Sequence, residues 1–177
     1  MDRTRWVAHQ RGAEETRMKR KCWVPFLIPL ISFAQIPSTR AADLKNVENL
    51  NKKTVIAFYD LAFNQHKPTE AAKKYFGSKY IQHNPMVPNG AAAFYTYFEE
   101  FYKTHPKAHV KIHRAVAEGD LVFLHLHSKI DDQDTGRAVV DIFRLENGKI
   151  VEHFDVAQSV PEKTANGNTM FEGSKEN

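Results

Sequence analysis

The hydrophobic period of the chain changes at Pro106, and this change restricts the fold more than any other feature of the sequence. Before Pro106, apolar residues recur three or four positions apart, which is the spacing of one helix face. After it, apolar and polar residues alternate, as they do in strands. Helices followed by a run of strands indicate an α+β domain in which the helices gather on one face of an antiparallel sheet.

Three helices are expected before Pro106. The first carries, at helical spacing, Val47, Leu50, Thr54, Phe58 and Leu61. The second covers Pro68–Phe76, because proline suits a first turn and Gly77 suits a stop. Asn89 is expected to cap the third helix, which runs from residue 90 to about 103. We assign the aromatic stripe of this third helix to the core.

Four strands are expected after Pro106: His109–Ala117, Leu121–Ile130, Arg137–Leu145 and Ile150–Val156. The dipeptide Asn147-Gly148 is a strong signal for a two-residue hairpin. A brief extended segment, residues 80–85, precedes the third helix. The strands therefore form an antiparallel meander that follows the helices.

Register decides which side chains share a face of this sheet. A tight turn at Asn147-Gly148 pairs Leu145 with Ile150 and Asp141 with Phe154. The loop at residues 131–136 is longer, so it does not fix which alternate residues of the strands on either side share a face. Of the two possible parities, we choose the one that places His125 and His127 beside Asp141. This choice unites three aromatic residues on one concave face: Phe123, Phe143 and Phe154.

The opposite, outer face is then also apolar, with Val122, Leu124, Leu126, Val140, Ile142 and Val151. We interpret Arg144, His153 and Asp155 on this face as interface or hairpin-bracing groups. The helices can cover only one of these two apolar faces of the sheet. The uncovered outer face therefore predicts a homodimer in which two sheets pack against each other.

Residues 1–42 are predicted to be a leader with a secretory signal, and Met18 is its expected start. A basic segment precedes an apolar run at 22–34, and Thr39-Arg40-Ala41 offers a cleavage site between small residues. We therefore expect a periplasmic or secreted protein with a folded domain at 43–171 and a disordered tail at 172–177. The alternative is an uncleaved anchor, but the run is short and holds two prolines, so stable membrane insertion is not expected.

The basic character of the chain lies in this leader. Lys and Arg outnumber Asp and Glu by eight to three up to Ala42, whereas the counts from Asp43 onward are seventeen and eighteen. The domain has no basic stripe with interleaved aromatic residues, so nucleic acid is not an expected partner.

Several segments together resemble the SnoaL-like polyketide cyclases of the NTF2-like superfamily: Tyr80–Pro85, Glu118–Asp120, Asp141–Arg144, Glu146–Asp155 and Asn166–Phe171. The resemblance covers about Leu44 to Phe171. It implies a cone-shaped barrel of helices on a curved sheet, with a pocket inside, dimers through the outer face, and no metal or cofactor. Phe154 departs from the pattern, because many relatives carry tryptophan there.

In that family a strand aspartate moves protons during an intramolecular aldol condensation, helped by a histidine on the neighbouring strand. The resemblance matches Asp141 and His127 to these catalytic positions. A carboxylate desolvated among aromatic side chains is also expected to have a raised pKa, which suits proton abstraction beside a carbonyl. The alternative is a structural aspartate paired with Arg114 or Arg137.

The other expected site residues contact substrate: His125, His83, Asn84, Phe123, Phe143 and Phe154. The His125-x-His127 spacing also suits a metal ion, with Asp141 or His83 as a third ligand. A further alternative is that both histidines are core residues whose hydrogen bonds are satisfied within the protein. His83 and Asn84 precede a proline, so ordinary turn chemistry is their alternative role.

The sequence thus predicts a cofactor-independent enzyme of the cyclase or isomerase type, acting by Asp/His acid–base catalysis on a small apolar or carbonyl compound. One alternative is a periplasmic binding protein of the same fold that carries a small molecule without turnover. Another is an interaction domain whose pocket is vestigial.

Overall fold

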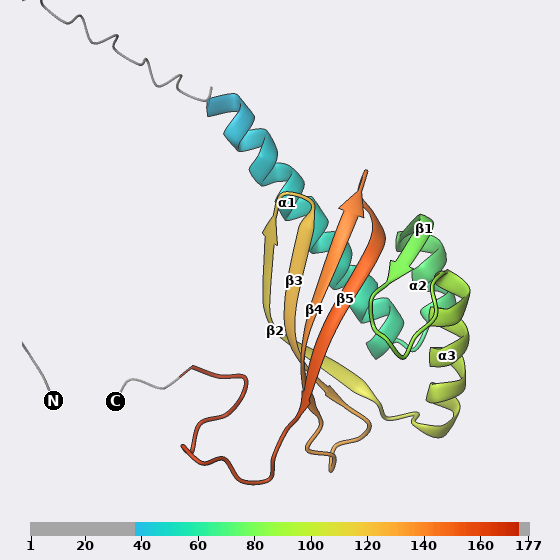
Figure 1. Ribbon diagram of the computed structural model, residues 1–177, viewed down its shortest axis with the longest axis vertical. Coiled ribbons are helices and arrows are strands. Elements are labelled where there is room, and N and C mark those ends of the chain that lie inside the picture. Colours follow the sequence, from blue (N-terminus) through green and yellow to red (C-terminus); the bar gives the residue numbers. More distant parts are fainter. Residues whose placement is uncertain (1–37, 174–177) are drawn as a thin grey trace, which may run out of the picture. The chain divides into compact units, whose positions relative to one another are not determined.

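The computed structural model describes residues 38–173 (Figure 1). In this part of the chain the helical elements are α1 (Ser38–Tyr59), the π-helical turn η1 (Asp60–Asn64), α2 (Pro68–Tyr75) and α3 (Ala91–Thr104). The strands are β1 (Phe76–Gln82), β2 (His109–Glu118), β3 (Leu121–Lys129), β4 (Arg137–Glu146) and β5 (Lys149–Ser159). Each predicted helix and strand is present, with ends displaced by a few residues except at the start of α1.

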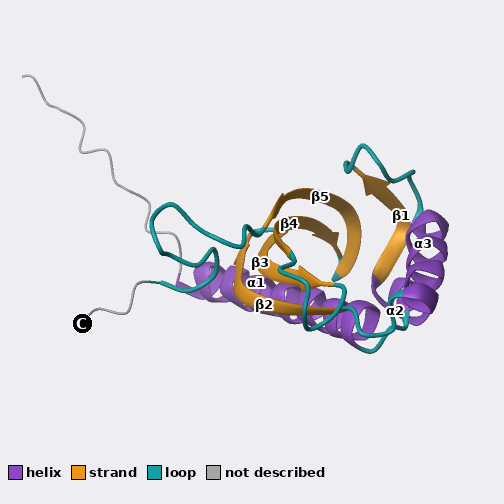
Figure 2. Ribbon diagram, turned by 90° about the horizontal axis from the view of Figure 1, so that it is seen from below, coloured by secondary structure: helices purple, strands orange, loops and turns teal. Residues whose placement is uncertain are grey.

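The strands form one mixed sheet in the order β1-β5-β4-β3-β2. The meander β2–β5 is antiparallel as predicted, and β1 adds a parallel edge strand beside β5. Figure 2 shows the sheet curling into an open cone, with α1 along the β2–β3 side and α2 and α3 beside β1. The α+β prediction is confirmed, but the sheet is not closed into a barrel.

Residues 1–37 of the predicted leader, with its start at Met18 and its apolar run at 22–34, lie outside the described residues, as does the end of the tail from 174. Helix α1 begins at Ser38 and runs through the predicted cleavage site. None of the helices in residues 38–173 has the length and apolar character needed to cross a membrane.

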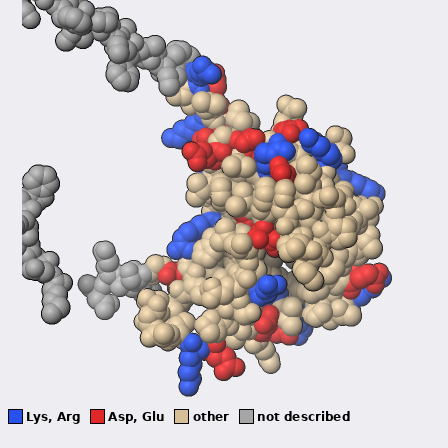
Figure 3. Space-filling view, viewed as in Figure 1, with Lys and Arg blue, Asp and Glu red and all other residues tan. Residues whose placement is uncertain are grey.

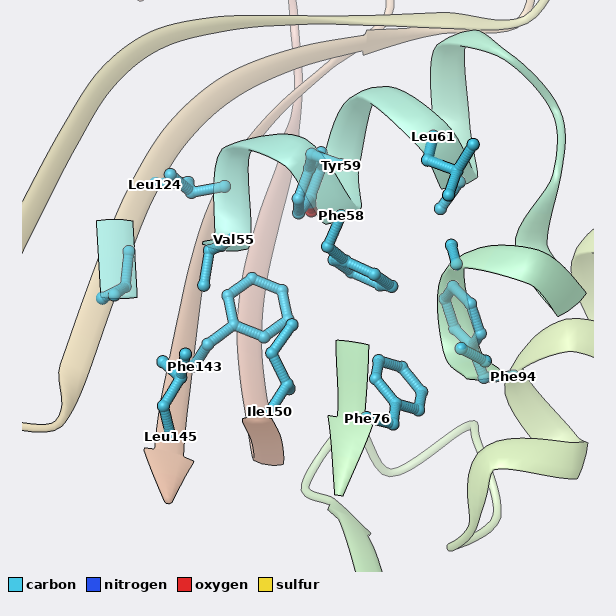
Figure 4. Packing of buried hydrophobic residues seen from close by; sticks show 14 of the residues in the cluster. Val55, Phe58, Tyr59, Leu61, Phe76, Phe94, Leu124, Phe143, Leu145 and Ile150 are labelled. Carbon is cyan, nitrogen blue, oxygen red and sulfur yellow. The ribbon is translucent and has the colours of Figure 1, made fainter. Parts of the chain in front are cut away.

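The core lies between the helices and the inner face of the sheet. Phe58 is 1% exposed, and its ring meets those of Tyr59, Phe63, Tyr75, Phe76, Phe94 and Phe143. Figure 4 shows Phe58, Phe76 and Phe143 converging between α1 and the strands. Val47 and Leu50, predicted on the buried side of the first helix, are 50% and 62% exposed. The buried residues of α1 are Asn51, Val55, Phe58 and Tyr59, so the helix contacts the core through its C-terminal half. Its first turns extend past the end of the sheet in Figure 1.

The junction of α2 and β1 differs from the prediction. Helix α2 starts at Pro68 as expected but ends at Tyr75, because Phe76 already has extended backbone angles and opens the strand. Asn89 does not cap α3, since Gly90 precedes that helix without a side-chain cap. The Asn89 Oδ1 instead accepts the backbone N–H of Gln82, at 2.8 Å, and so fixes the end of β1.

The parity chosen across the 131–136 loop is wrong. Ser128 pairs with Arg137, so Asp141 stands opposite Leu124, whereas His125 stands opposite Val140. The loop is fixed internally, because Asp134 accepts the backbone N–H groups of Ile130 and Gly136. Asp141 therefore lies on the inner face with the aliphatic residues of β3, namely Val122, Leu124 and Leu126, all of which are buried.

A bulge in β5 changes the second register. Leu145 pairs with Ile150 as predicted, but Arg144 pairs with Glu152, so Val151 is an extra residue. Beyond a bulge every following side chain changes face. Asp141 therefore stands opposite Asp155 instead of Phe154, and Phe143 stands opposite His153. Both assignments of His153 and Asp155 to the outer face are wrong.

Gly77 makes room for this bulge. A Cβ built at Gly77 would lie 2.8 Å from Cγ1 of Val151, closer than real side chains approach. Ile150 and Val151 are both buried although they are consecutive. The glycine read from sequence as a helix stop thus lies inside β1, where its missing side chain lets β1 and β5 pair.

Candidate functional site

The site centres on a buried pair formed by Asp141 of β4 and His153 of β5. The Asp141 residue is 3% exposed, and its Oδ1 lies 3.3 Å from Nε2 of His153. Desolvation by burial raises the pKa of Asp141, the hydrogen bond and charge of His153 partly oppose this, and the charge of Asp155 adds to it. Among residues 38–173 the only ion-pair partner of Asp141 is His153, so neither Arg114 nor Arg137 pairs with it. Arg114 instead contacts His125 Nδ1 and the Phe171 carbonyl.

Further polar side chains extend this pair toward β1. Nδ1 of His153 lies 2.8 Å from the Gln82 Oε1, and the Gln82 Nε2 donates to the Tyr80 hydroxyl at 3.2 Å. Burial raises the pKa of Tyr80 above its usual range, so this hydroxyl stays neutral. We call the connected set the inner polar network: Tyr80, Gln82, Asn84, Asp141, His153 and Asp155. It places a carboxyl group, an imidazole and a phenol within one hydrogen-bonded chain.

Asp155 is held beside Asp141 by the β1–α3 loop. The Asn84 Nδ2 donates to Asp155 Oδ2 at 2.8 Å, and the Asn84 Oδ1 accepts the backbone N–H of Met86 at 2.9 Å. Oδ1 of Asp155 is buried without a hydrogen-bond partner among the described residues. Two carboxyl groups from neighbouring strands therefore face the same interior, and a second negative charge disfavours ionisation of Asp141.

Three of the predicted site residues lie at this network. Asp141 and Asn84 belong to it, and the Phe143 ring lies 4.8 Å from that of His153. Phe143 also packs on Phe58, so it joins the network to the core. The predicted desolvated aspartate is thus present, although its aromatic neighbour comes from its own strand and not from Phe154.

The other predicted residues lie on the outer face, and the predicted contact between His127 and Asp141 is wrong. His127 Nε2 meets the Thr135 carbonyl at 2.7 Å, and its ring stacks on Phe171. The remaining members of this outer group are His125, His83, Phe123 and Phe154. They cannot contact a ligand held by Asp141, because the sheet separates them from it.

His83 shows how the outer group is satisfied. Its Nε2 lies 2.7 Å from Glu152 Oε1, and its ring stacks on Phe154 at 3.9 Å. Glu152 also bonds Arg144, which bonds Glu146 in turn, so Arg144 braces the hairpin as predicted. Of the two third ligands considered for a metal at His125 and His127, Asp141 lies on the other face of the sheet and His83 is bonded to Glu152. Within residues 38–173, no three His, Cys, Asp or Glu side chains are grouped to hold a metal ion.

Sequence reasoning missed Tyr80, Gln82, His153 and Asp155. The alternation Tyr80-x-Gln82-x-Asn84 was a usable signal, since every second residue of a strand points to one face. The signal for His153 was hidden by the bulge at Val151, which depends on contacts with β1.

Exposure within the network is uneven. The His153 side chain is 13% exposed, whereas that of Asp141 is 4% exposed. His153 is thus the more accessible member of the pair.

Surface hollows of about 260 and 440 Å³ lie at residues 158–170 and at residues 66–73 with Glu99, and neither includes a network residue. On the face seen in Figure 3, acidic and basic side chains are interspersed and do not separate by sign.

Comparison with known proteins identifies the family. The family model described as "SnoaL-like domain" matches residues 55–153. A search of curated proteins found no significant match. A SnoaL-like protein of unknown function from Burkholderia thailandensis has a similar structure, with a TM-score of 0.54 and 16% identity over 63% of this chain and 97% of that one.

Two further solved structures share the fold. A candidate SnoaL-like polyketide cyclase from Jannaschia gives a TM-score of 0.52, with 17% identity over 62% of this chain and 86% of that one. An epoxide hydrolase from Mycobacterium tuberculosis gives 0.50, with 19% identity over 63% and 84%. Identities this low establish the fold alone. Because the family model matches more than half of the chain, this protein belongs to the SnoaL-like domain family.

Proposed function

We propose that the inner polar network is the active site of a cofactor-independent acid–base enzyme that acts on a small carbonyl compound. The observation that carries this proposal is the Asp141 carboxyl group, 3% exposed, in hydrogen-bond contact with Nε2 of His153. Burying an ionisable group costs stability, and carboxyl groups whose pKa is perturbed in this way gather at active sites.

Asp141 is the general base of this proposal. Desolvation raises its pKa, which makes the carboxylate a stronger base than an exposed aspartate. It takes a proton from the carbon beside the carbonyl, and the substrate becomes an enolate. His153 replaces His127 as the partner, because it contacts Asp141 directly. The neutral Tyr80 hydroxyl supplies a further hydrogen-bond donor on the same face.

The structural relatives support a small organic substrate without fixing the reaction. One solved neighbour is described as a candidate polyketide cyclase and another as an epoxide hydrolase. For this chain we favour aldol-type cyclisation or isomerisation, since both need only a base and a group that stabilises the enolate. The protein's own side chains supply both.

We further propose that the protein forms a homodimer through the outer face of β4 and β5. Val140 and Val156 are 37% and 69% exposed there, and Ile142 and Phe154 lie beside them. Exposed apolar residues gathered on one sheet face are typical of an interface. This face differs from the predicted one, because Leu124 and its neighbours on β3 are in the core.

The proposed function is tested with a substrate identified by mass spectrometry of small molecules that the purified protein retains. Asp141→Asn should lower turnover by about 10²–10⁴-fold, the usual contribution of a positioned base. His153→Gln should also lower it, less than additively with Asp141→Asn, because both serve one step. His127→Gln should leave it unchanged, since His127 faces the other side of the sheet. Full turnover by a folded Asp141→Asn protein would refute the proposal and favour a binding protein.

A further inference from the structure

The orientation of the Gln82 side chain is fixed by the backbone. The oxygen and nitrogen of a glutamine amide are assigned from their hydrogen-bond partners. The backbone N–H of Asn84 lies 2.9 Å from one end of this amide, and a backbone N–H can only donate. That end is therefore the oxygen, and the nitrogen donates to the Tyr80 hydroxyl at 3.2 Å.

This oxygen determines where His153 carries its proton. Gln82 Oε1 lies 2.8 Å from Nδ1 of His153, and an amide oxygen has no hydrogen to donate. Nδ1 must therefore carry the proton. In a neutral imidazole the other nitrogen, Nε2, then presents a lone pair, and this nitrogen lies 3.3 Å from Oδ1 of Asp141. A lone pair facing a carboxylate oxygen is unfavourable unless one proton lies between them.

We propose that Gln82 is a positioning residue that holds the proton on Nδ1 of His153, so that Nε2 and Asp141 share a single proton. The pair is then either a carboxylic acid beside a neutral imidazole or a carboxylate beside an imidazolium. The strand geometry supports this role, because Gln82 and His153 are register partners on the parallel strands β1 and β5. The backbone of Gln82 is itself fixed at this end of β1 by Asn89.

The catalytic consequence rests on the proposed function. When the shared proton is on Nε2, Asp141 is a carboxylate and can accept a proton from substrate carbon. The C–H bond breaks, its electron pair remains on the substrate as an enolate, and an O–H bond forms on Asp141. The imidazolium then balances the enolate charge. Return of the proton to the substrate restores the pair.

Nitrogen NMR of the full-length protein, without substrate, tests this inference. Long-range ¹H–¹⁵N spectra of protein labelled on histidine report which ring nitrogen carries a proton, and the signal lost in His153→Gln identifies His153. We expect Nδ1 of wild-type His153 to be protonated at every pH at which the protein is folded. A neutral His153 with its proton on Nε2 and none on Nδ1 would overturn the inference.

Two substitutions of Gln82 sharpen the test. Gln82→Met keeps the length of the side chain but removes the acceptor, so the proton of neutral His153 should move mainly to Nε2, where the Asp141 carboxylate accepts it. Gln82→Glu keeps an acceptor and should retain the proton on Nδ1. An unchanged Nδ1–H signal in folded Gln82→Met would show that Gln82 does not position the ring.

The outcome is separable from that of the proposed function. If the spectra show the expected proton on Nδ1 but Asp141→Asn retains full turnover, the positioning role of Gln82 stands and the catalytic proposal fails. If Asp141→Asn loses turnover while His153 carries its proton on Nε2, the catalytic proposal stands and the role of Gln82 is wrong.

Discussion

Replacing Asp141 by asparagine should stabilise the fold relative to the wild type, and the gain should grow as the pH rises. Burial raises the pKa of Asp141 above that of an unfolded aspartate, which is about 3.9. The folded protein therefore keeps a proton that the unfolded chain has released, and wild-type stability falls as the pH rises from about 4 toward the folded pKa. Asparagine has nearly the same shape, cannot ionise, and offers an N–H to Nε2 of His153.

The size of the effect follows from one linked proton. Such a proton changes the free energy of unfolding by at most about 1.4 kcal/mol per pH unit. Between pH 5 and pH 8 the stability of Asp141→Asn relative to the wild type should therefore rise by up to about 4 kcal/mol. Urea denaturation followed by circular dichroism measures this difference. Both tryptophans, Trp6 and Trp23, precede the described domain, so their fluorescence is a poor probe of it.

Asp134→Asn is the matched control. Hydrogen bonds from the backbone N–H groups of Ile130 and Gly136 lower the pKa of Asp134, so its contribution is present above the unfolded pKa and is lost only in acid. Asp134→Asn should therefore destabilise the fold by an amount that does not change between pH 5 and pH 8. A pH-independent difference for Asp141→Asn, or one that grows toward pH 5, would refute the argument from burial.

Three further predictions concern the core, the interface and the leader. Phe58→Ala should lower the free energy of unfolding by about 3–5 kcal/mol in urea denaturation, since six rings surround Phe58; a loss below about 1 kcal/mol would contradict this packing. Val156→Lys should weaken the proposed dimer in sedimentation velocity, whereas Met86→Lys, at an 86% exposed loop position, should not; a monomeric wild type would remove the dimer. If the leader is exported, N-terminal sequencing of the mature protein should begin near Ala42, and soluble protein that retains Cys22 would rule out cleavage.

The elements of this fold could be predicted from sequence because their signals are local. Apolar spacing in α2 and α3, alternation after Pro106 and the Asn147-Gly148 turn all describe neighbours in the chain. Asn147 and Gly148 indeed have positive φ, at 51° and 73°, as a tight hairpin turn of this kind requires. The strand order of the meander follows directly from such turns.

The faces of the strands could not be predicted, because two distant features set them. The loop between Lys129 and Arg137 fixes one parity through its own hydrogen bonds. The bulge at Val151 sets the other, and it depends on the missing side chain of Gly77 on a different strand. The burial of Asp141 could be predicted because its strand was right. Its contact with His153, in place of the predicted His127, could not, because both features were invisible in the local pattern.

Deuterium exchange tests the central claim most directly, because it detects proton abstraction without requiring the natural product. The wild type, Asp141→Asn and Asp134→Asn proteins are incubated in D₂O with a panel of alkyl ketones, aryl ketones and β-keto esters, and NMR measures deuterium at the carbon beside the carbonyl. We predict exchange above the buffer rate for at least one compound, equal in the wild type and Asp134→Asn and about 10²–10⁴-fold slower in Asp141→Asn. Equal exchange by folded wild type and Asp141→Asn, or exchange at the buffer rate across the whole panel, would contradict the account.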